Sequence, residues 1–414
     1  MKTKIKVSVE AQSLSQIVSL SQIVSSIDDL LIQILLYLPI KSLIRFKSVS
    51  KHWNSLIDDP RFCLLRNPNP NPAVGIFFPC SFSGFNPWIE YVPFSGIKSS
   101  NPPFSKLGFN KRPSDIRIIC SCNGLLLCST TRDYNNLARR YYVYNPTSNK
   151  FSTLPKLDGE EDWISSQICG MNLAFDPAKS PHYKVVCIRS WRYMYQLEVY
   201  SSETGGPWRK CGEPFKAQVI FQTGVYWNGA IHWIINGFRN SLHFWDSRDS
   251  LYFNVDDEIL RVMPLLPLPD ASNWKSNYRF WESCDHLHYI IDIIRSSISF
   301  NVYEMRQDYS EWFIKYRVDL SPVVAAFPEM IRSNPINFYM DWRNRPIYAI
   351  CSLVRGEKDE DSFLVLNIEG KAIRYNIVYQ TFETIFEFVG AEVEGRERFL
   401  GRIGYQYIES LCGV

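Results

Sequence analysis

The stretch YYVYNPTSNKFSTLP, residues 141–155, decides how most of this 414-residue chain is interpreted. Its aromatic and β-branched residues favour strands, and the Asn, Pro and Ser residues between them favour a turn, so it predicts a β-hairpin. Four later segments have the same form: Leu197–Gly212, Leu251–Leu265, Phe300–Tyr316 and Phe363–Ile377. Aligned on one position, the hairpins repeat at roughly 50 residues, a period typical of β-propeller blades. The aligned positions are Tyr144, Tyr200, Val255, Tyr303 and Leu366.

Further strands are expected before each hairpin. The clearest lie in Asn123–Ser129, Asn172–Ile188, Gly224–Ile235, Asp285–Ile294 and Arg345–Val354. Four strands in each repeat indicate a kelch-like or propeller-like all-β domain with five visible blades. A sixth blade is expected to be composite, with Arg402–Leu411 pairing with Ala73–Phe78 and Trp88–Phe94, because ring closure removes free sheet edges. A two-sheet β-sandwich is the alternative fold, since the spacings between repeats are unequal.

The segment before these repeats has a helical pattern. Apolar residues recur at helical spacing in Leu30, Leu31, Ile34, Leu35 and Leu38, after two aspartates that favour a helix start. Pro39 is expected to end this helix, and a second short helix should carry Leu43. A third should begin after an N-cap at Ser50, contain Trp53 and stop at Pro60. The sequence therefore predicts a small three-helix unit, and the whole chain is an α+β multidomain protein.

Domain limits follow from local composition. Residues 1–25 contain the hexapeptide SLSQIV twice in tandem and are expected to be a poorly ordered leader. Residues 26–66 form the helical unit. Residues 67–72, NPNPNP, predict a stiff extended linker, because proline blocks helix and fixes φ. The β-domain then runs over 73–414.

Composition excludes several classes of protein. A net charge of +3 lacks the strong basic field of a nucleic-acid binder. The N-terminus has no signal-peptide core, and no run of about 18 apolar residues predicts a membrane span. The 11 cysteines are scattered, and Cys128, Cys187 and Cys351 lie in apolar strand-like runs where reduced thiols pack as small hydrophobes. We therefore expect an intracellular protein, cytoplasmic or nuclear, in a reducing compartment.

Motifs for catalysis and metal binding are weak. Cys120 and Cys122 lack the second ligand pair of a zinc site, and His286 with His288 is too small a ligand set for a catalytic metal. His232 lies in an apolar strand and is expected to be a core histidine. We find no P-loop, dinucleotide fingerprint or nucleophile elbow. The expectation is a non-catalytic protein with no cofactor, no metal and no catalytic residues.

Residues 26–62 resemble the F-box motif of plant proteins. The matching residues are Asp28-Asp29-Leu30-Leu31, Ile34-Leu35, Leu38-Pro39, Lys41-Ser42-Leu43, Arg45-Phe46-Lys47, Val49-Ser50-Lys51, Trp53, Leu56-Ile57, Asp59-Pro60 and Phe62. Ser26-Ile27 stands where the family has Leu-Pro, and Gln33 where it has Glu. The later segments, among them SCNGLLLCS and GVYWNGAIHWI, resemble the F-box-associated domain of the same family.

The resemblance implies a substrate-recognition subunit of an SCF (Skp1–cullin–F-box) ubiquitin ligase. A Skp1-like adaptor would bind the F-box and link it to a cullin–RING ligase, while the β-domain would bind an unidentified target protein. A unit of about 40 residues cannot bury a full core alone, so an exposed apolar stripe is expected to dock the partner. Four basic residues between Lys41 and Lys51 would favour an acidic partner. The expected adaptor-binding residues are Leu30, Leu31, Ile34, Leu35, Leu38, Pro39, Leu43, Val49 and Trp53.

Target binding is expected at long polar connections, namely Leu157–Cys169, Arg189–Tyr195 and Arg355–Asp361. Within them Trp191, Arg192 and Tyr193 have residue types that favour binding hot spots. Two other functions stay open. The altered Ser26-Ile27 is compatible with an F-box-bearing regulatory protein that assembles no ligase, and a propeller enzyme would need a catalytic cluster at its channel.

Overall fold

The computed structural model describes residues 28–66, 72–82, 85–94, 116–130, 139–157, 167–191, 194–235, 249–266, 276–293, 298–328, 348–368, 370–387, 392–393, 396–400 and 403–414. The chain divides into two compact units. The helical unit comprises Met1–Asn69, Pro177–Pro181 and Ser410–Gly413, and the propeller unit comprises Pro70–Asp176, His182–Glu409 and Val414. The tandem hexapeptide, Ser26-Ile27 and most of the NPNPNP stretch lie outside the described residues, and the domain limits drawn from them stay predictions.

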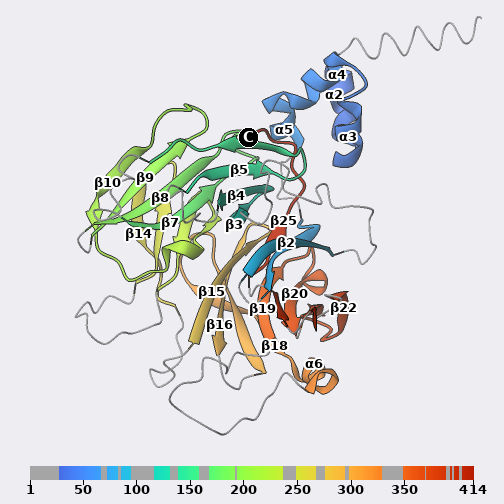
Figure 1. Cartoon of the computed structure of the whole chain (residues 1–414), viewed down its shortest axis with the longest axis vertical. Coiled ribbons are helices and arrows are strands. Elements are labelled where there is room, and N and C mark those ends of the chain that lie inside the picture. Colours follow the sequence, from blue (N-terminus) through green and yellow to red (C-terminus); the bar gives the residue numbers. More distant parts are fainter. Residues whose placement is uncertain are drawn as a thin grey trace, which may run out of the picture. The chain divides into compact units, whose positions relative to one another are not determined.

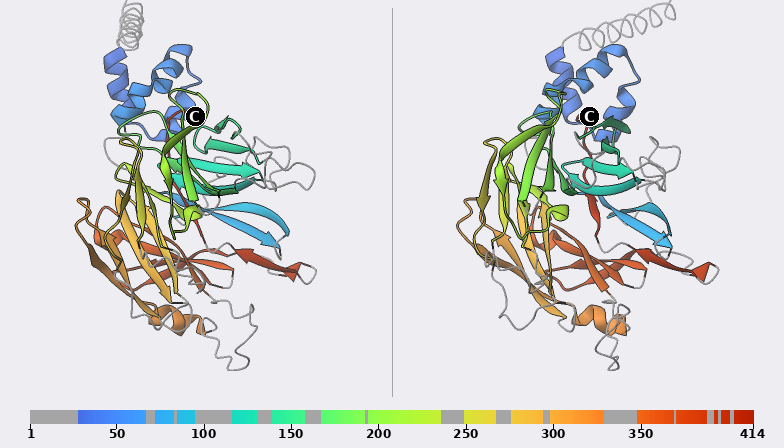
Figure 2. Two further views of the ribbon diagram at one scale, coloured as in Figure 1. Left: turned by 90° about the vertical axis from the view of Figure 1, so that its left-hand side faces the viewer. Right: turned by 60° about the vertical axis from the view of Figure 1, so that its left-hand side comes forward.

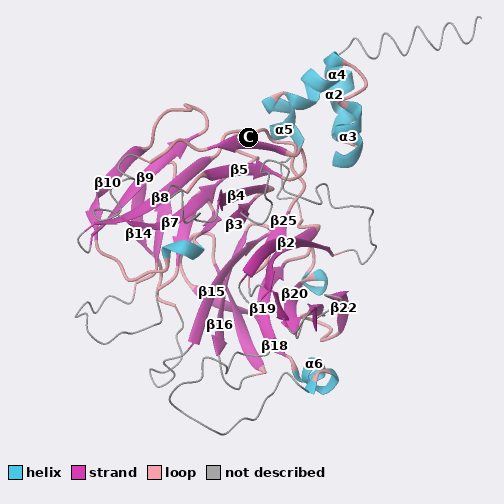
Figure 3. Cartoon of the chain, in the orientation of Figure 1, coloured by secondary structure: helices cyan, strands magenta, loops and turns pink. Residues whose placement is uncertain are grey.

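The helical unit contains four described helices, one more than expected (Figure 3). They are α2 (Asp28–Leu36), α3 (Ile40–Phe46), α4 (Lys51–Asp58) and α5 (Pro60–Arg66). Ser50 caps α4 as expected, since its side chain accepts a hydrogen bond from Trp53 N at 3.1 Å. Pro60 follows the end of α4 but also begins α5, because a proline at the first helical position needs no N–H partner. None of the described helices is long and apolar enough to cross a membrane.

The core of the helical unit includes the C-terminal segment of the chain. Leu35, Leu43 and Phe62 are buried, and Leu411 packs into the same cluster. A disulfide joins Cys63 in α5 to Cys412, which the expected reducing compartment did not predict, whereas Cys128, Cys187 and Cys351 are buried and in no disulfide, as expected. The bonded pair is separated by 349 residues in sequence, so no local pattern could have indicated it.

The propeller unit is built from six antiparallel sheets (Figures 1 and 2). The first sheet contains β1 (Gly75–Phe82), β2 (Phe85–Pro93), β23 (Glu392–Val393), β24 (Arg396–Leu400) and β25 (Tyr405–Tyr407). The next two contain β3 (Ile116–Cys122), β4 (Leu125–Thr130), β5 (Tyr141–Asn145) and β6 (Lys150–Thr153), and then β7 (Gln167–Ala174), β8 (Lys184–Trp191), β9 (Met194–Ser201) and β10 (Arg209–Phe215).

The remaining sheets each have four strands. They contain β11 (Val225–Trp227), β12 (Ala230–Trp233), β13 (Leu251–Asn254) and β14 (Ile259–Val262); β15 (Ser276–Ser283), β16 (His286–Ile293), β17 (Ser299–Met305) and β18 (Trp312–Asp319); and β19 (Tyr348–Val354), β20 (Phe363–Ile368), β21 (Lys371–Asn376) and β22 (Phe382–Glu387). Short helices η2 (Phe221–Thr223), α6 (Ser321–Ala326) and η4 (Asp359–Asp361) lie between strands.

The composite sheet closes the ring as predicted. Gly75 of β1 pairs with Pro93 of β2 on one side and with Tyr407 of β25 on the other. First strands of successive sheets touch one another, β3 with β7, β7 with β11, β11 with β15 and β15 with β19, and β25 touches β3. Separate four-stranded sheets with first strands in such a ring form a propeller, so the β-sandwich alternative is excluded. Apolar cores fill the spaces between successive blades, for example around Val302 and Leu366.

The two ends of each blade differ in which strands are connected there. We call the end where a first strand turns into a second, and a third into a fourth, the turn end. There Asn145 accepts hydrogen bonds from Thr147 N and Ser148 N, and Asn254 and Asn376 make the equivalent turns. The residue four positions after each Asn has a positive φ, as in Asn149, Glu258 and Gln380. We call the opposite end the loop end.

One repeat was assigned wrongly. In the first four hairpins the structure pairs the third strand with the fourth, but Phe363–Ile377 contains the second and third strands, β20 and β21. The equivalent Asn turn comes later, at Asn376, so aligning Leu366 with Tyr144 shifted the last blade by one strand. First strands β3 and β15 were not singled out among the expected strands either.

Candidate functional site

Only some of the nine predicted adaptor-binding residues are exposed on the surface of the helical unit. Leu30 and Ile34, one turn apart on α2, are 38% and 45% exposed, and Val49 is 59% exposed. Pro39 is exposed, whereas Leu38 and Trp53 are half-buried. The indole of Trp53 packs edge-on against Phe46, with ring centroids 5.3 Å apart.

Three of the nine predicted adaptor contacts lie in the interior. Leu31, Leu35 and Leu43 are at most 3% exposed, so they shape the unit and offer no surface. The apolar run contains both classes, and helical spacing alone did not separate them. Tyr37, directly after α2, is 92% exposed and follows Leu30 by two helical turns, a spacing that could have identified it.

The basic residues of the helical unit are not all free. Lys47 Nζ lies 2.5 Å from Asp58 Oδ1 on the neighbouring helix. Its charge is therefore balanced within the unit. The side chains of Arg45 and Lys51 are exposed.

The three predicted target-binding connections do not lie at one end of the propeller. Arg189–Tyr195 lies between β8 and β9, at the loop end, whereas residues 158–166 of Leu157–Cys169 lie outside the described residues. Arg355–Asp361 joins β19 to β20 at the turn end. Trp191 ends β8 and is 56% exposed, while Arg192 and Tyr193 lie outside the described residues. The target-binding role of all three stays a prediction.

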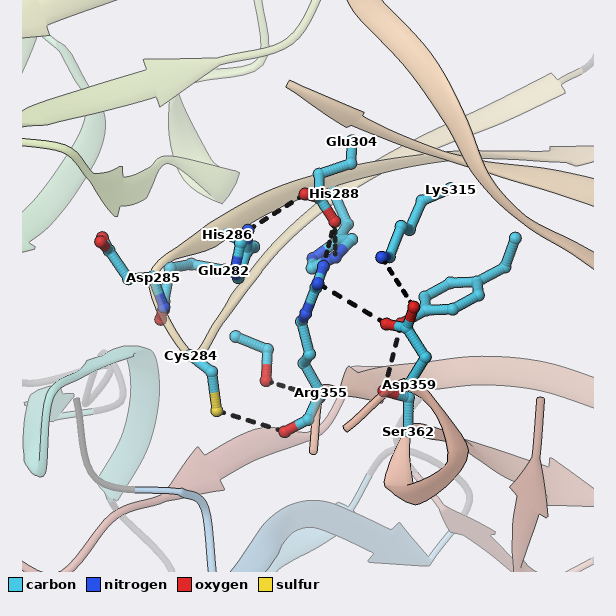
Figure 4. Close-up of polar contacts among 12 residues, drawn as sticks. Glu282, Cys284, Asp285, His286, His288, Glu304, Lys315, Arg355, Asp359 and Ser362 are labelled. Atoms are coloured by element: carbon cyan, nitrogen blue, oxygen red, sulfur yellow. Dashed lines mark hydrogen bonds and ion pairs between the residues drawn. The ribbon is translucent and has the colours of Figure 1, made fainter. Parts of the chain in front are cut away.

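A buried ionic cluster lies at the turn end (Figure 4). Glu304 Oε1 lies 3.0 Å from His286 Nδ1, and its Oε2 is 3.3 Å from His288 Nε2 and in contact with the Arg355 guanidinium. The Glu304 side chain is 7% exposed and that of Arg355 is 14% exposed. The cluster therefore joins β16 and β17 of one blade to the connection after β19 of the next.

Ionisation in this cluster follows from burial and pairing. Burial alone would raise the pKa of Glu304, but the hydrogen bonds and charges of His286 and His288 outweigh it and lower the pKa well below the usual range. Burial lowers the pKa of His288, despite the nearby carboxylate. A second carboxylate extends the cluster, since Asp359 contacts Arg355, Lys315 Nζ at 2.9 Å and Tyr316 Oη at 2.9 Å.

The cluster is better suited to hold two blades together than to bind a metal ion, and we call it the ionic clasp. The oxygens of Glu304 already face three cationic or imidazole groups, and the Arg355 charge would repel a metal ion. No group of three or more His, Cys, Asp or Glu among the described residues is arranged to hold a metal.

Of the other residues considered for chemistry, Cys122 and His232 are buried and Cys120 is half-buried. Cys122 donates from Sγ to Phe175 O, and burial raises the pKa of Cys120 to about 12. His232 is fully buried, its Nε2 lies 2.9 Å from Tyr309 Oη, and burial lowers its pKa to about 3.

Comparisons with known proteins agree with the two units. A model of the F-box domain matches residues 28–65, and a model described as the F-box associated beta propeller domain matches residues 95–274. The chain is similar to F-box protein At5g07610 of Arabidopsis thaliana, 36% identical over 428 residues that cover 96% of this chain and 94% of that protein. It is also similar to F-box only protein 8 of the same plant, 28% identical over 50% of this chain and 70% of that protein.

One solved structure illustrates the level of structural similarity. A nidogen/laminin complex matches with a TM-score of 0.37 and 9% identity, over 81% of this chain and 99% of the matched chain. The F-box match, the propeller-domain match and the relative that spans almost the whole chain together assign the family: this chain belongs to the F-box proteins that carry an F-box-associated β-propeller domain.

Proposed function

We propose that this chain is the substrate-recognition subunit of an SCF-type ubiquitin ligase. The helical unit binds a Skp1-like adaptor and, through it, a cullin–RING ligase. The propeller unit binds a target protein. The chain itself forms and breaks no covalent bond, and it acts by raising the effective concentration of a target lysine near a charged ubiquitin-conjugating enzyme.

The observation that carries the proposal is the exposed apolar face of α2 in a chain of this family. Leu30 and Ile34 point away from a core that is already filled by Leu31 and Leu35. Two neighbouring aliphatic side chains that stay exposed in so small a unit favour a docking surface for a partner. Exposed Arg45 and Lys51 suit an acidic partner, and the partner would be held by apolar contact with electrostatic steering.

The loop end of the propeller is the better candidate for target binding. Turn-end connections are short or are tied into hydrogen bonds between blades, such as Asn123 Nδ2 to Phe175 O and Trp227 Nε1 to Asp285 O. At the loop end, Trp191 offers an exposed aromatic ring at the end of β8. Variable connections on a rigid scaffold are where binding residues concentrate.

Co-purification with a Skp1-like adaptor tests the proposal. The full chain should elute with the adaptor as one complex and bind it with a submicromolar dissociation constant in calorimetry. A folded chain that does not bind would contradict the ligase proposal. That result would favour the alternative, an F-box-bearing regulatory protein that assembles no ligase. A second trial would then replace Ser26-Ile27 by Leu-Pro and measure adaptor binding again.

A further inference from the structure

A cleft of about 450 Å³ lies between two blades at the loop end of the propeller. Residues of β3, β4 and β5 line one side, and residues at the start of β7 and in η2 line the other. This volume lies within the range of pockets that hold small ligands or single side chains of a bound peptide.

One wall of the cleft carries a row of polar residues in register. Arg117 of β3 pairs with Ser129 of β4, and Ser129 pairs with Tyr141 of β5. Residues directly opposite in antiparallel strands point to the same face, so the three side chains share the face that lines the cleft. Arg139, two residues before Tyr141, lines the cleft as well.

The other wall owes its shape to a glycine. A Cβ at Gly170 would come within 2.4 Å of Phe221 O, so only glycine lets η2 pack this closely on β7. The close approach positions Gln222 at the cleft, while Ile168 and Met171 of β7 make this wall largely apolar.

The charge of the cleft is one-sided. Arg117 and Arg139 line it, and the described residues that line it include no aspartate or glutamate. Within the described part of the chain, neither guanidinium takes part in an ion pair. Glu198, a buried carboxylate on the facing blade, is paired with Arg189 at 3.5 Å.

We propose that this cleft binds the carboxylate or phosphate group of an acidic segment in the target protein, an inference that rests on the proposed function. Arg117 and Arg139 would hold the oxyanion through charge-assisted hydrogen bonds, which planar guanidinium groups make well with both anions. Ser129 and Gln222 supply further polar groups, and Ile168 and Met171 accept an adjacent apolar side chain. The exposed Trp191 ends the strand that pairs with β7, at the same end of the blade.

Small probes with one anionic and one apolar part test the cleft without knowledge of the target. The full chain, labelled at its arginine side chains for NMR, is titrated with benzoate, phenyl phosphate and neutral benzamide. Benzoate or phenyl phosphate should bind saturably, with a dissociation constant on the order of 1 mM, and shift the signals of Arg117 and Arg139. Preference between the two anions identifies the carboxylate or phosphate source.

Two variants decide whether the arginines are responsible. Arg139→Gln should weaken binding of the preferred anion about tenfold, as expected for a lost charge-assisted hydrogen bond. Arg140→Gln is the matched control, because Arg140 is adjacent and exposed but does not line the cleft, and it should leave binding unchanged. Equal binding of benzamide, no saturable binding of either anion, or equal effects of the two variants would overturn the inference.

Adaptor binding is measured on the same samples. Arg139→Gln should leave it unchanged. A chain that binds the adaptor but no anion loses only this inference, whereas a chain that binds the anion but no adaptor loses the proposed ligase function.

Discussion

The helical unit and the propeller unit differ in how they bury their apolar side chains. The propeller buries apolar residues such as Leu366 and Val302 between successive blades, and a composite sheet closes its ring. The helical unit fills a small core with help from Leu411 and still leaves Leu30, Ile34 and Val49 in solvent. Leu265 and Tyr379 of the propeller are exposed as well, so exposure alone does not separate the two units. What sets the helical unit apart is the small core beneath its exposed side chains, and this fits the docking role proposed for α2.

The largest expected effect concerns the ionic clasp of the propeller. Glu304→Ala leaves Arg355 and His286 without their buried carboxylate and should lower the free energy of unfolding by about 3–5 kcal/mol. Urea denaturation measures the loss. Glu311→Ala is the control, because Glu311 forms an exposed pair with Arg306 on the same hairpin and its loss should cost at most about 1 kcal/mol. Equal losses would show that the cluster is not a clasp.

A smaller effect is expected from the disulfide of the helical unit. Reduction of Cys63–Cys412 should destabilise that unit by about 2–4 kcal/mol, because the bond restricts the unfolded chain and holds Leu411 in the core. Thermal unfolding with and without dithiothreitol measures this. Cys412→Ser should unfold at the reduced wild-type temperature and show no response to the reductant. A wild-type protein that is indifferent to dithiothreitol would contradict the structural role of the bond.

The stability of the propeller should depend on pH through one carboxyl group, that of Glu282. Burial, with a smaller contribution from Asp285, raises the pKa of Glu282 to about 7, although its Oε1 accepts a hydrogen bond from Asp285 N. The folded state therefore binds more protons than the unfolded state between about pH 4.5 and 7, and this contribution to stability is lost as the pH rises through that range.

Glu282→Gln keeps the hydrogen-bond acceptor and removes the titration. Relative to wild type, the variant should gain about 2 kcal/mol of stability between pH 5 and pH 8, measured by urea denaturation at each pH. Glu304 does not interfere in this range, because its lowered pKa affects stability only below about pH 4.5. A stability difference that does not change with pH would contradict the raised pKa of Glu282.

Sequence patterns predicted the features that depend on interactions between neighbouring residues. The turn at Asn145 and the cap at Ser50 depend on hydrogen bonds within a few residues, so both were predictable from the sequence. The composite blade was predictable because a closed ring must join its first strand to its last.

Contacts between distant residues were not predictable in this way. Glu304 of one blade contacts Arg355 of the next, and Arg117 and the start of β7 come to line one cleft only after the blades stack. Periodicity placed Leu30 and Leu31 in one apolar set, and only packing in three dimensions buried one and exposed the other. The offset in the last blade arose because two consecutive hairpins have similar composition, and only the Asn376 turn identifies the equivalent strand pair.

Adaptor binding by Ile34→Asp beside Leu65→Asp tests the proposed docking surface on α2 most sharply. Ile34 and Leu65 are aliphatic residues of the helical unit whose side chains are 45% and 59% exposed. Neither change should therefore lower the free energy of unfolding by more than about 0.5 kcal/mol. Calorimetry with a Skp1-like adaptor should show binding to wild type and to Leu65→Asp, and at least a hundredfold loss for Ile34→Asp, because a charge would be buried at the apolar interface. Unchanged binding by folded Ile34→Asp would contradict the claim that the exposed face of α2 docks the adaptor.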